Sequence, residues 1–129
     1  QHTFKNGSRV DCLLTLGSAE LSIPIDSKFS WENYKKMRET NDENQKKQFA
    51  KDFSQDITNH IAEVSQYVIE GETAPIAYMF IGSAGVFDAI VKSDRDFVKK
   101  ARLKNVIMAS PDRIGAPQTQ YPIFSFKKL

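Results

Sequence analysis

Residues 9–28 read RVDCLLTLGSAELSIPIDSK, two apolar runs joined by a Gly-Ser-Ala-Glu turn. In the second run every other residue from Leu21 to Ile25 is apolar, the period of two that marks one face of a β-strand. The stretch therefore predicts two strands, over 9–16 and 21–28, that pair through the turn. Pro24 has no backbone N–H to donate, so we expect a sheet edge or a bulge at that point.

Two helices are expected after this pair of strands, and a short strand before it. Asn6-Gly7 is a strong signal for a tight hairpin turn and predicts the preceding strand. Ser30 is placed to cap a helix that begins at Trp31, with Glu32 in its first turn. Thr40 and Glu43 have capping-box spacing at the start of a second helix. This amphipathic helix is about 26 residues long and ends at Gly71, and its apolar stripe consists of Phe49, Phe53, Ile57, Ile61, Val64 and Val68.

The second half of the chain alternates short apolar strands with helices. Residues 76–81 predict a strand buried on both faces, and 106–109 predict another. Between them we expect a helix over 86–91 and a further one that Ser93 caps and that ends near Arg102. This order is typical of an α/β domain with a mixed β-sheet flanked by helices. We expect the domain to span 1–111 and the proline-broken tail, 112–129, to be irregular.

Length and composition fit one folded domain. The chain has 129 residues, 40% of them hydrophobic, and a formal net charge of +2. This near balance predicts no partner, so a contact with nucleic acid must come from a local basic cluster. The single cysteine, Cys12, allows no internal disulfide, fits a reducing compartment such as the cytoplasm, and is expected to be a buried apolar residue. The sequence has no apolar stretch long enough for a membrane-spanning helix, so we expect no membrane contact from this segment, and it has no signal peptide. The missing initiator Met predicts a fragment of a longer protein.

Asp11, Asp26 and Lys28 are the candidate catalytic residues. If the two predicted strands pair through their turn, Asp11 and Asp26 reach neighbouring positions and can share a face with Lys28. Two carboxylates this close repel each other unless a cation lies between them, and hard oxygen ligands suit Mg²⁺ or Mn²⁺. The metal ion can acidify a bound water molecule, while the lysine orients that water or neutralises charge on a phosphoryl group. A solvated strand face is the competing interpretation of the same spacing.

A set of short motifs favours the catalytic interpretation. Residues 23–29 read IPIDSKF and are followed by WENY at 31–34. Further segments are His60-Ile61 and Tyr67-Val68-Ile69 on the long helix, AYMFI at 77–81, GVF at 85–87 and NVIMASP at 105–111. In this order and spacing they resemble the RmuC-type DNA recombination proteins, and the resemblance spans almost everything from Gln1 to Pro111.

The resemblance implies a nuclease of the restriction-endonuclease-like, PD-(D/E)XK kind that is linked to DNA recombination. It implies that Asp11 and Asp26 bind the metal ion and that Lys28 is the catalytic lysine. Three features differ from the family pattern. A helix with a glutamate normally precedes the first strand and is absent here, Ala84 occupies the position of a family glutamate, and the tail after Pro111 diverges from the Thr-rich turn and helix of the family. The chain is therefore expected to be truncated at its N-terminus and divergent at its C-terminus.

Several other side chains have a structural and a functional interpretation. The densest basic run consists of Lys99, Lys100, Arg102 and Lys104. It is expected to contact DNA phosphates if it shares a face with Asp26, and otherwise to be the solvated end of a helix, where the dipole favours cations. His60, at the border of the apolar stripe, is interpreted as a structural residue. Trp31 and Tyr34 are interpreted as core residues, with base stacking as the alternative.

The leading hypothesis is a metal-dependent DNA nuclease domain that hydrolyses phosphodiesters in DNA recombination or repair, with Mg²⁺ or Mn²⁺ as cofactor and DNA as partner. A catalytically inactive DNA-binding or scaffolding domain of the same fold is the alternative, which Ala84 and the missing upstream acid motivate. A third interpretation is a structural module whose long helix packs against a partner protein. An exposed apolar stripe on that helix would indicate this third case.

Overall fold

The computed structural model describes residues 2–3, 9–10, 12–15, 22–27, 30–111 and 113–114, with side chains over 22–27 and 30–111. Strands β1 (His2–Thr3) and β2 (Arg9–Val10) form a two-stranded antiparallel sheet. The larger sheet has five strands in the order β3 (Cys12–Thr15), β4 (Ser22–Asp26), β5 (Ala77–Phe80), β6 (Val106–Ser110) and β7 (Arg113–Ile114). The described part of the chain also holds the helices α1 (Glu32–Glu39), α2 (Glu43–Ser65), α3 (Ala84–Ser93) and α4 (Phe97–Leu103).

The larger sheet is mixed, as the sequence predicts. β4, β5 and β6 are parallel to one another, and β3 and β7 are antiparallel to their neighbours. The single strand expected over 9–16 is instead two strands, because Arg9–Val10 pairs with β1 whereas Cys12–Thr15 pairs with β4. The two strands therefore belong to different sheets.

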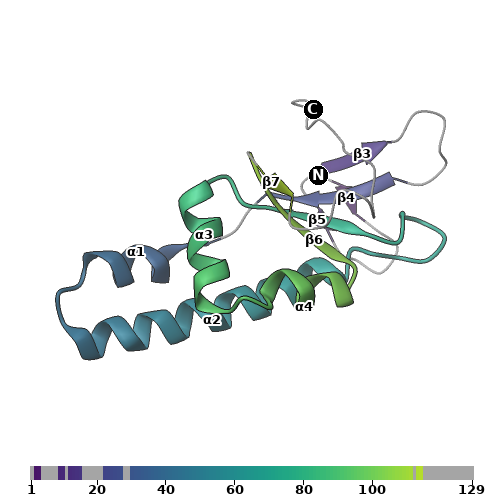
Figure 1. Ribbon diagram of the computed structural model, residues 1–129. Coiled ribbons are helices and arrows are strands. Elements are labelled where there is room, and N and C mark those ends of the chain that lie inside the picture. Colours follow the sequence, from purple (N-terminus) through teal and green to yellow (C-terminus); the bar gives the residue numbers. More distant parts are fainter. Residues whose placement is uncertain are drawn as a thin grey trace.

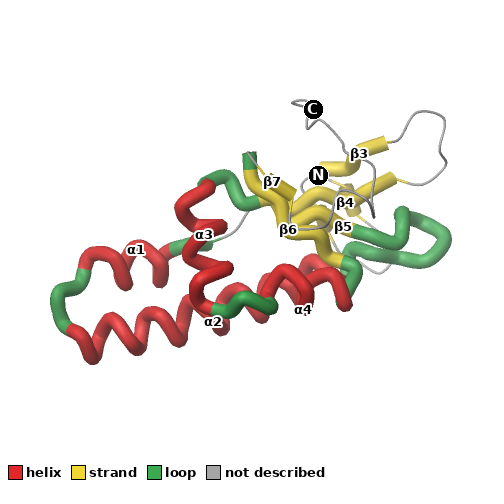
Figure 2. The backbone as a smooth tube through the Cα atoms, in the orientation of Figure 1, coloured by secondary structure: helices red, strands yellow, loops and turns green. Residues whose placement is uncertain are grey.

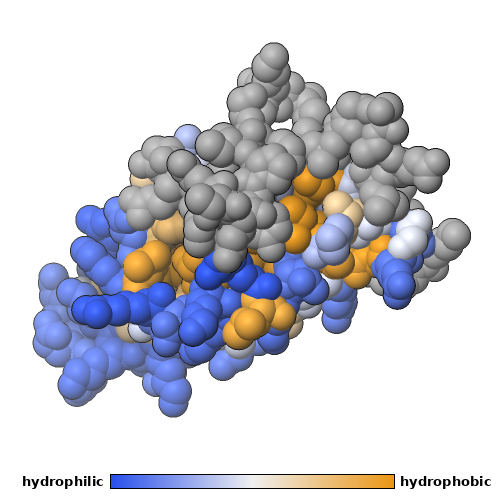
Figure 3. All heavy atoms as spheres, turned by 45° about the vertical axis from the view of Figure 1, so that its right-hand side comes forward, coloured by the Kyte–Doolittle hydropathy of each residue, from blue (hydrophilic) through white to orange (hydrophobic). Residues whose placement is uncertain are grey.

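All four helices belong to one side of the larger sheet (Figures 1 and 2). β4, β5 and β6 follow one another in sequence order, so their two parallel crossovers return on the same face. The α1–α2 pair forms the first crossover and α3 with α4 the second. In Figure 1, α1 lies along the first part of α2, and both extend beyond the sheet. On the face drawn in Figure 3, hydrophilic side chains cover most of this helical part.

Two apolar clusters form the core, one on each face of the sheet. On the helical face, Met79 of β5 and Met108 of β6 pack with Ile57 of α2 and Ile90 of α3. The stripe expected on the long helix is part of this cluster, since Phe53, Ile57, Ile61 and Val64 are buried there. The exposed stripe expected for a partner-binding module is therefore not found on α2. The second cluster consists of Ile23, Ile25, Ile76, Tyr78, Ile107 and Ala109.

Pro24 lies in an interior strand, so the sheet-edge alternative is wrong. The ladder between β4 and the chain before β5 is irregular next to it. Ser22 forms an isolated bridge with Thr73, and the next pair is Ile25 with Tyr78, so two residues of β4 (23 and 24) face four residues (74–77). A proline is tolerated where a ladder is interrupted in this way, which is the bulge alternative.

The helix ends differ from the predicted ones because other residues provide the caps. The first helix begins at Glu32, with Trp31 rather than Ser30 at the cap position and no side-chain cap. Asp42 rather than Thr40 caps α2, since its Oδ1 accepts the N–H groups of Asn44 and Gln45 at 2.9 and 3.1 Å. α2 has 23 residues and ends at Ser65, before Gly71, which adopts φ 84° in the following turn.

The helices of the second crossover also begin and end at other residues than expected. α3 starts at Ala84 because the Ser83 side chain accepts the N–H of Val86, and it runs on to Ser93. Ser93 is therefore the last residue of α3 rather than the cap of α4. The sheet continues into Arg113–Ile114, two residues of the segment expected to be irregular, while 115–129 lie outside the described residues. The domain boundaries stay a prediction.

Truncation of Ile57 tests how strongly α2 is fixed to the sheet. The side chain is fully buried between α2 and the strands, so Ile57→Ala removes apolar contacts and leaves a cavity. We expect the free energy of unfolding, measured by urea denaturation, to fall by about 3 kcal/mol. The matched control is Lys51→Ala, an exposed position on the same helix, which should change it by less than about 0.5 kcal/mol. Equal effects of the two substitutions would contradict the described packing of α2.

Candidate functional site

The carboxyl ends of the three parallel strands meet at one edge of the sheet. Asp26 ends β4, Phe80 ends β5 and Ser110 ends β6. In open α/β sheets this edge is where ligands bind, because the loops and helix starts that follow the strands gather there. The start of α1 follows β4 and the start of α3 follows β5. The candidate site is therefore this edge, with Asp26 as its acidic residue.

Asp26 is buried on the helical face of the sheet. Ile23 and Ile25 belong to the cluster on the other face, so the alternation of the strand turns Asp26 toward the helices. Its neighbour in the ladder is Met79, an apolar residue of the core. Only 7% of the Asp26 side chain is exposed, and a carboxylate so buried needs a partner.

His60 of α2 supplies this partner. Its Nε2 lies 2.8 Å from Oδ1 of Asp26, and its Nδ1 lies 3.5 Å from Oε2 of Glu63, one turn further along the helix. Burial by itself lowers the pKa of His60, but the hydrogen bond and the negative charge of Asp26, together with Glu63, outweigh it and raise the pKa above its ordinary value. The raised pKa favours an imidazolium that is held between two carboxylates.

A polar hollow lies on the solvent side of His60. Three further carboxylates line it, those of Glu32, Asp56 and Glu63, together with Ser30, Asn33 and Asn59. Asn33 donates a hydrogen bond from Nδ2 to Oδ2 of Asp56 at 2.7 Å and so joins α1 to α2 at this point. His60 thus separates the open, acidic hollow from the buried carboxylate of Asp26.

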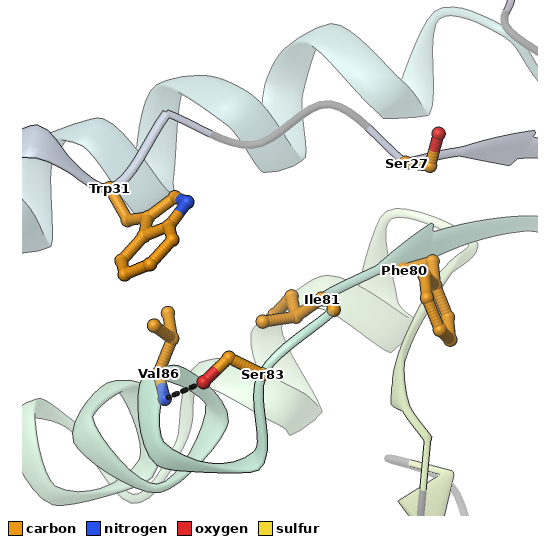
Figure 4. A pocket seen from close by; sticks show the side chains of 7 residues that line it. Ser27, Trp31, Phe80, Ile81, Ser83 and Val86 are labelled. Carbon is orange, nitrogen blue, oxygen red and sulfur yellow. Dashed lines mark hydrogen bonds between the residues drawn. The ribbon is translucent and has the colours of Figure 1, made fainter.

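A second hollow lies at the same edge, between the start of α1 and the start of α3 (Figure 4). Ser27, which directly follows Asp26, lies on one side of it together with Trp31. Ser83 and Val86 lie on the opposite side, at the beginning of α3. The edge of the sheet therefore combines one buried carboxylate with two different hollows.

Of the three predicted catalytic residues, the structure describes Asp26. Asp11 and Lys28 lie outside the described residues. Cys12, which follows Asp11, is the ladder partner of Ile25, which precedes Asp26. Their catalytic roles, including that of Asp26, stay predictions at this point.

The basic run of α4 lies mainly away from Asp26. α4 leads through Lys104 into the amino end of β6, whereas Asp26 lies at the carboxyl end of the parallel strand β4. Lys100 forms an ion pair with Asp94, with 2.6 Å between Nζ and Oδ2. This hydrogen-bonded pairing raises the pKa of Lys100 and lowers the pKa of Asp94. Contacts of Lys99, Lys100, Arg102 and Lys104 with DNA stay a prediction, and this geometry favours contacts that do not share an edge with Asp26.

Two residues of the edge were assigned structural roles from the sequence. His60 is predicted to be a structural residue at the border of the helix stripe, and in the structure its hydrogen-bond partner is Asp26. The sequence places His60 on the polar flank of the apolar stripe. Which residue it contacts depends on how α2 packs against the sheet. Trp31 was interpreted as a core residue and is 40% exposed, whereas Tyr34 is buried as expected. Among the described side chains, no cluster of three or more His, Cys, Asp or Glu residues could hold a metal ion.

Comparison with known proteins identifies the family. The sequence matches the RmuC family over residues 1–116. The chain therefore belongs to the RmuC family, and this membership suggests a role in DNA recombination. No curated protein and no solved structure matches the chain. None of the helices in the described ranges has the length and apolar character that a bilayer crossing needs, and the compartment stays a prediction.

The raised pKa of His60 predicts a pH dependence of folding. A basic group with a raised pKa in the folded state stabilises the fold fully below its unfolded pKa, about 6.5, and loses that contribution as the pH rises through the folded pKa. His60→Gln keeps a hydrogen-bonding side chain but removes the charge. We expect it to lower the stability of the metal-free protein by about 1 kcal/mol near pH 6, and clearly less near pH 9.

Thermal unfolding of both proteins across this pH range measures the difference. Glu63→Gln should produce a smaller change of the same sign, because the Glu63 side chain is 61% exposed. A stability difference between parent and His60→Gln that does not vary with pH would show that His60 stays neutral, contrary to the described contacts.

Proposed function

We propose that the chain is a metal-dependent DNA nuclease domain in which Asp26 binds the metal ion. The observation that supports this most is a carboxylate buried at the carboxyl edge of the parallel strands, with its Oδ1 held 2.8 Å from His60. The RmuC family assignment, with its link to DNA recombination, makes a phosphodiester the natural substrate. Perturbed titratable groups at a sheet edge are typical of functional sites.

Asp11 and Asp26 are the proposed ligands of Mg²⁺ or Mn²⁺. Oδ1 of Asp26 is engaged by His60, while Oδ2 has no hydrogen-bond donor among the described residues, so this oxygen is suited to a cation. Carboxylate oxygens are the ligands that these hard cations prefer. Asp11 lies outside the described residues, but Cys12 and Ile25, which follow and precede the two aspartates, are ladder partners. When bound, such an ion acidifies a water molecule and stabilises charge on the phosphoryl group.

His60 acts in this proposal as a positioning residue. A carboxylate that ligates a metal is commonly fixed by a hydrogen bond from a neighbouring side chain, and such partners strongly affect metal affinity. The described geometry fits this role because one oxygen of Asp26 is bonded to His60 on a rigid helix. Lys28, two residues after Asp26, is the proposed residue that orients the attacking water or neutralises the phosphoryl charge.

We also propose that the fold of this domain is restriction-endonuclease-like. A restriction-endonuclease-like core is supported by the mixed sheet, in which the antiparallel pair β3–β4 precedes a helical crossover to the parallel strand β5. In this arrangement Asp26 ends the second strand of the antiparallel pair, and the helical crossover supplies His60.

An inactive DNA-binding or scaffolding domain is the second candidate. The observation that favours it is Ala84, the first residue of α3, which stands where relatives are expected to carry a glutamate. A carboxylate at that position would lie beside the hollow that Ser83 and Val86 line. Such a domain would bind DNA with strong salt dependence, independently of metal ions and of Asp26.

A cleavage assay distinguishes the two candidates. We expect the protein with Mn²⁺ to cut DNA oligonucleotides and the cleavage rate to fall by about 100-fold or more in Asp26→Asn, which removes the charge but keeps the size. Lys28→Ala should have a comparable effect. His60→Gln should raise the Mn²⁺ concentration needed for half-maximal rate by about ten-fold, with a smaller effect at saturating metal.

The matched control is Asp56→Asn, which changes an aspartate of the neighbouring hollow that the proposal leaves without a catalytic role. Its cleavage rate should stay within about two-fold of the parent rate. Cleavage that persists in Asp26→Asn would contradict the proposed site. Salt-sensitive DNA binding by the parent without any cleavage would favour the inactive domain.

A further inference from the structure

The hollow of Figure 4 has an aromatic side chain on one side and the start of helix α3 on the other. The indole of Trp31 points across the gap toward Val86 and Ser83 at the start of α3, and Phe80 and Ile81 come from the end of β5 (Figure 4). The hollow measures about 210 Å³. Pockets for complete drug-sized ligands are usually about 300–1,000 Å³, so this one is suited to a single planar ring system.

Trp31 is placed to receive such a ring. It is 40% exposed, although its neighbour Tyr34 is buried against Phe53 with 5.6 Å between ring centroids. The packing of Tyr34 fixes the start of α1, and Trp31 directly precedes that helix. Trp31 is therefore exposed beside the hollow, next to a helix that is held in place. It offers a preformed surface on which a planar ring can stack.

Lys35 adds a positive charge over one face of the ring. Its Nζ lies 4.4 Å from the Trp31 ring centroid, one turn along α1, and the side chain is exposed. Lys36 and Arg38 follow on the same short helix. A planar ring next to a cation complements a nucleotide, because the base stacks on the indole and the phosphate is attracted by the ammonium group.

We propose that this hollow binds one unstacked base of a single-stranded segment of DNA, with Trp31 as the stacking platform and Lys35 beside the phosphate. The inference rests on the proposed function, since it takes DNA as the ligand of this edge. Ser27 lines the hollow and directly follows Asp26, so the bound base belongs to a nucleotide next to the proposed cleavage position. The platform thereby holds the strand in register with the carboxylate.

Fluorescence of Trp31 tests this directly, because it is the only tryptophan of the chain. The protein is titrated with a short single-stranded oligothymidylate in the presence of EDTA, so that cleavage does not interfere. We expect the strand to quench the tryptophan emission. A strand of the same length made of abasic nucleotides keeps the phosphates but lacks the bases, and it should bind more weakly and quench little.

Affinity of variants, measured by anisotropy of a labelled oligothymidylate, completes the test. Trp31→Ala should weaken binding by about ten-fold, as expected for the loss of one base stack, whereas Trp31→Phe should retain most of the affinity. Leu103→Ala, an exposed apolar residue of α4, is the control and should bind as the parent does. Both measurements are made in EDTA and without cleavage, which separates this inference from the cleavage mechanism.

Three results would overturn the inference. Equal quenching by the abasic strand would show that phosphates alone are recognised. An unchanged affinity of Trp31→Ala would show that the indole carries no base. Absence of DNA binding by the parent would exclude the subsite. Cleavage that depends on Asp26 is tested separately, in the cleavage assay.

Discussion

The contact between Asp26 and His60 is the constraint on which the arrangement of the site depends. The carboxylate at the end of β4 has an apolar methionine beside it in the ladder. It needs a partner that carries a positive charge or donates a hydrogen bond. The imidazole that provides it belongs to a helix reached after a separate helix and turn, 34 residues later. The same contact therefore holds the direction of the carboxylate and connects α2 to the end of β4.

The apolar core makes this contact possible. His60 can reach Asp26 because Ile57 and Ile61 on either side of it fix α2 against Met79 and the other strand residues. α1 in turn packs on α2 through Tyr34 and Phe53 and through the hydrogen bond between Asn33 and Asp56. This second layer holds the start of α1, and with it Trp31, next to the end of β4. Packing of the helices thus brings a carboxylate, an imidazole with a raised pKa and an exposed indole to one edge of the sheet.

The sequence predicts the elements better than it predicts their contacts. Strand alternation and the helix stripe depend on local periodicity, so β4, β5, β6 and the buried face of α2 could be expected from it. Helix caps depend on which of several neighbouring polar residues accepts the first N–H groups. Asp42 caps α2 instead of Thr40, and Ser83 caps α3, for which the sequence predicts a later start. The spacing of Asp11, Asp26 and Lys28 and the family resemblance both indicate Asp26, but no local pattern indicates that His60 contacts it or that Trp31 stays exposed. Both depend on tertiary packing between residues far apart in the sequence.

Binding of Mn²⁺, measured by isothermal titration calorimetry, tests the proposed role of this edge most directly. We expect the parent protein to bind the ion, Asp26→Asn not to bind it, and Asp56→Asn, in the neighbouring hollow, to bind it as the parent does. Since coordination by two aspartates requires both to be deprotonated, the affinity should also weaken toward acidic pH. Mn²⁺ binding that is equal in the parent and in Asp26→Asn would contradict the proposed role of Asp26, because the ion would then be held by other residues.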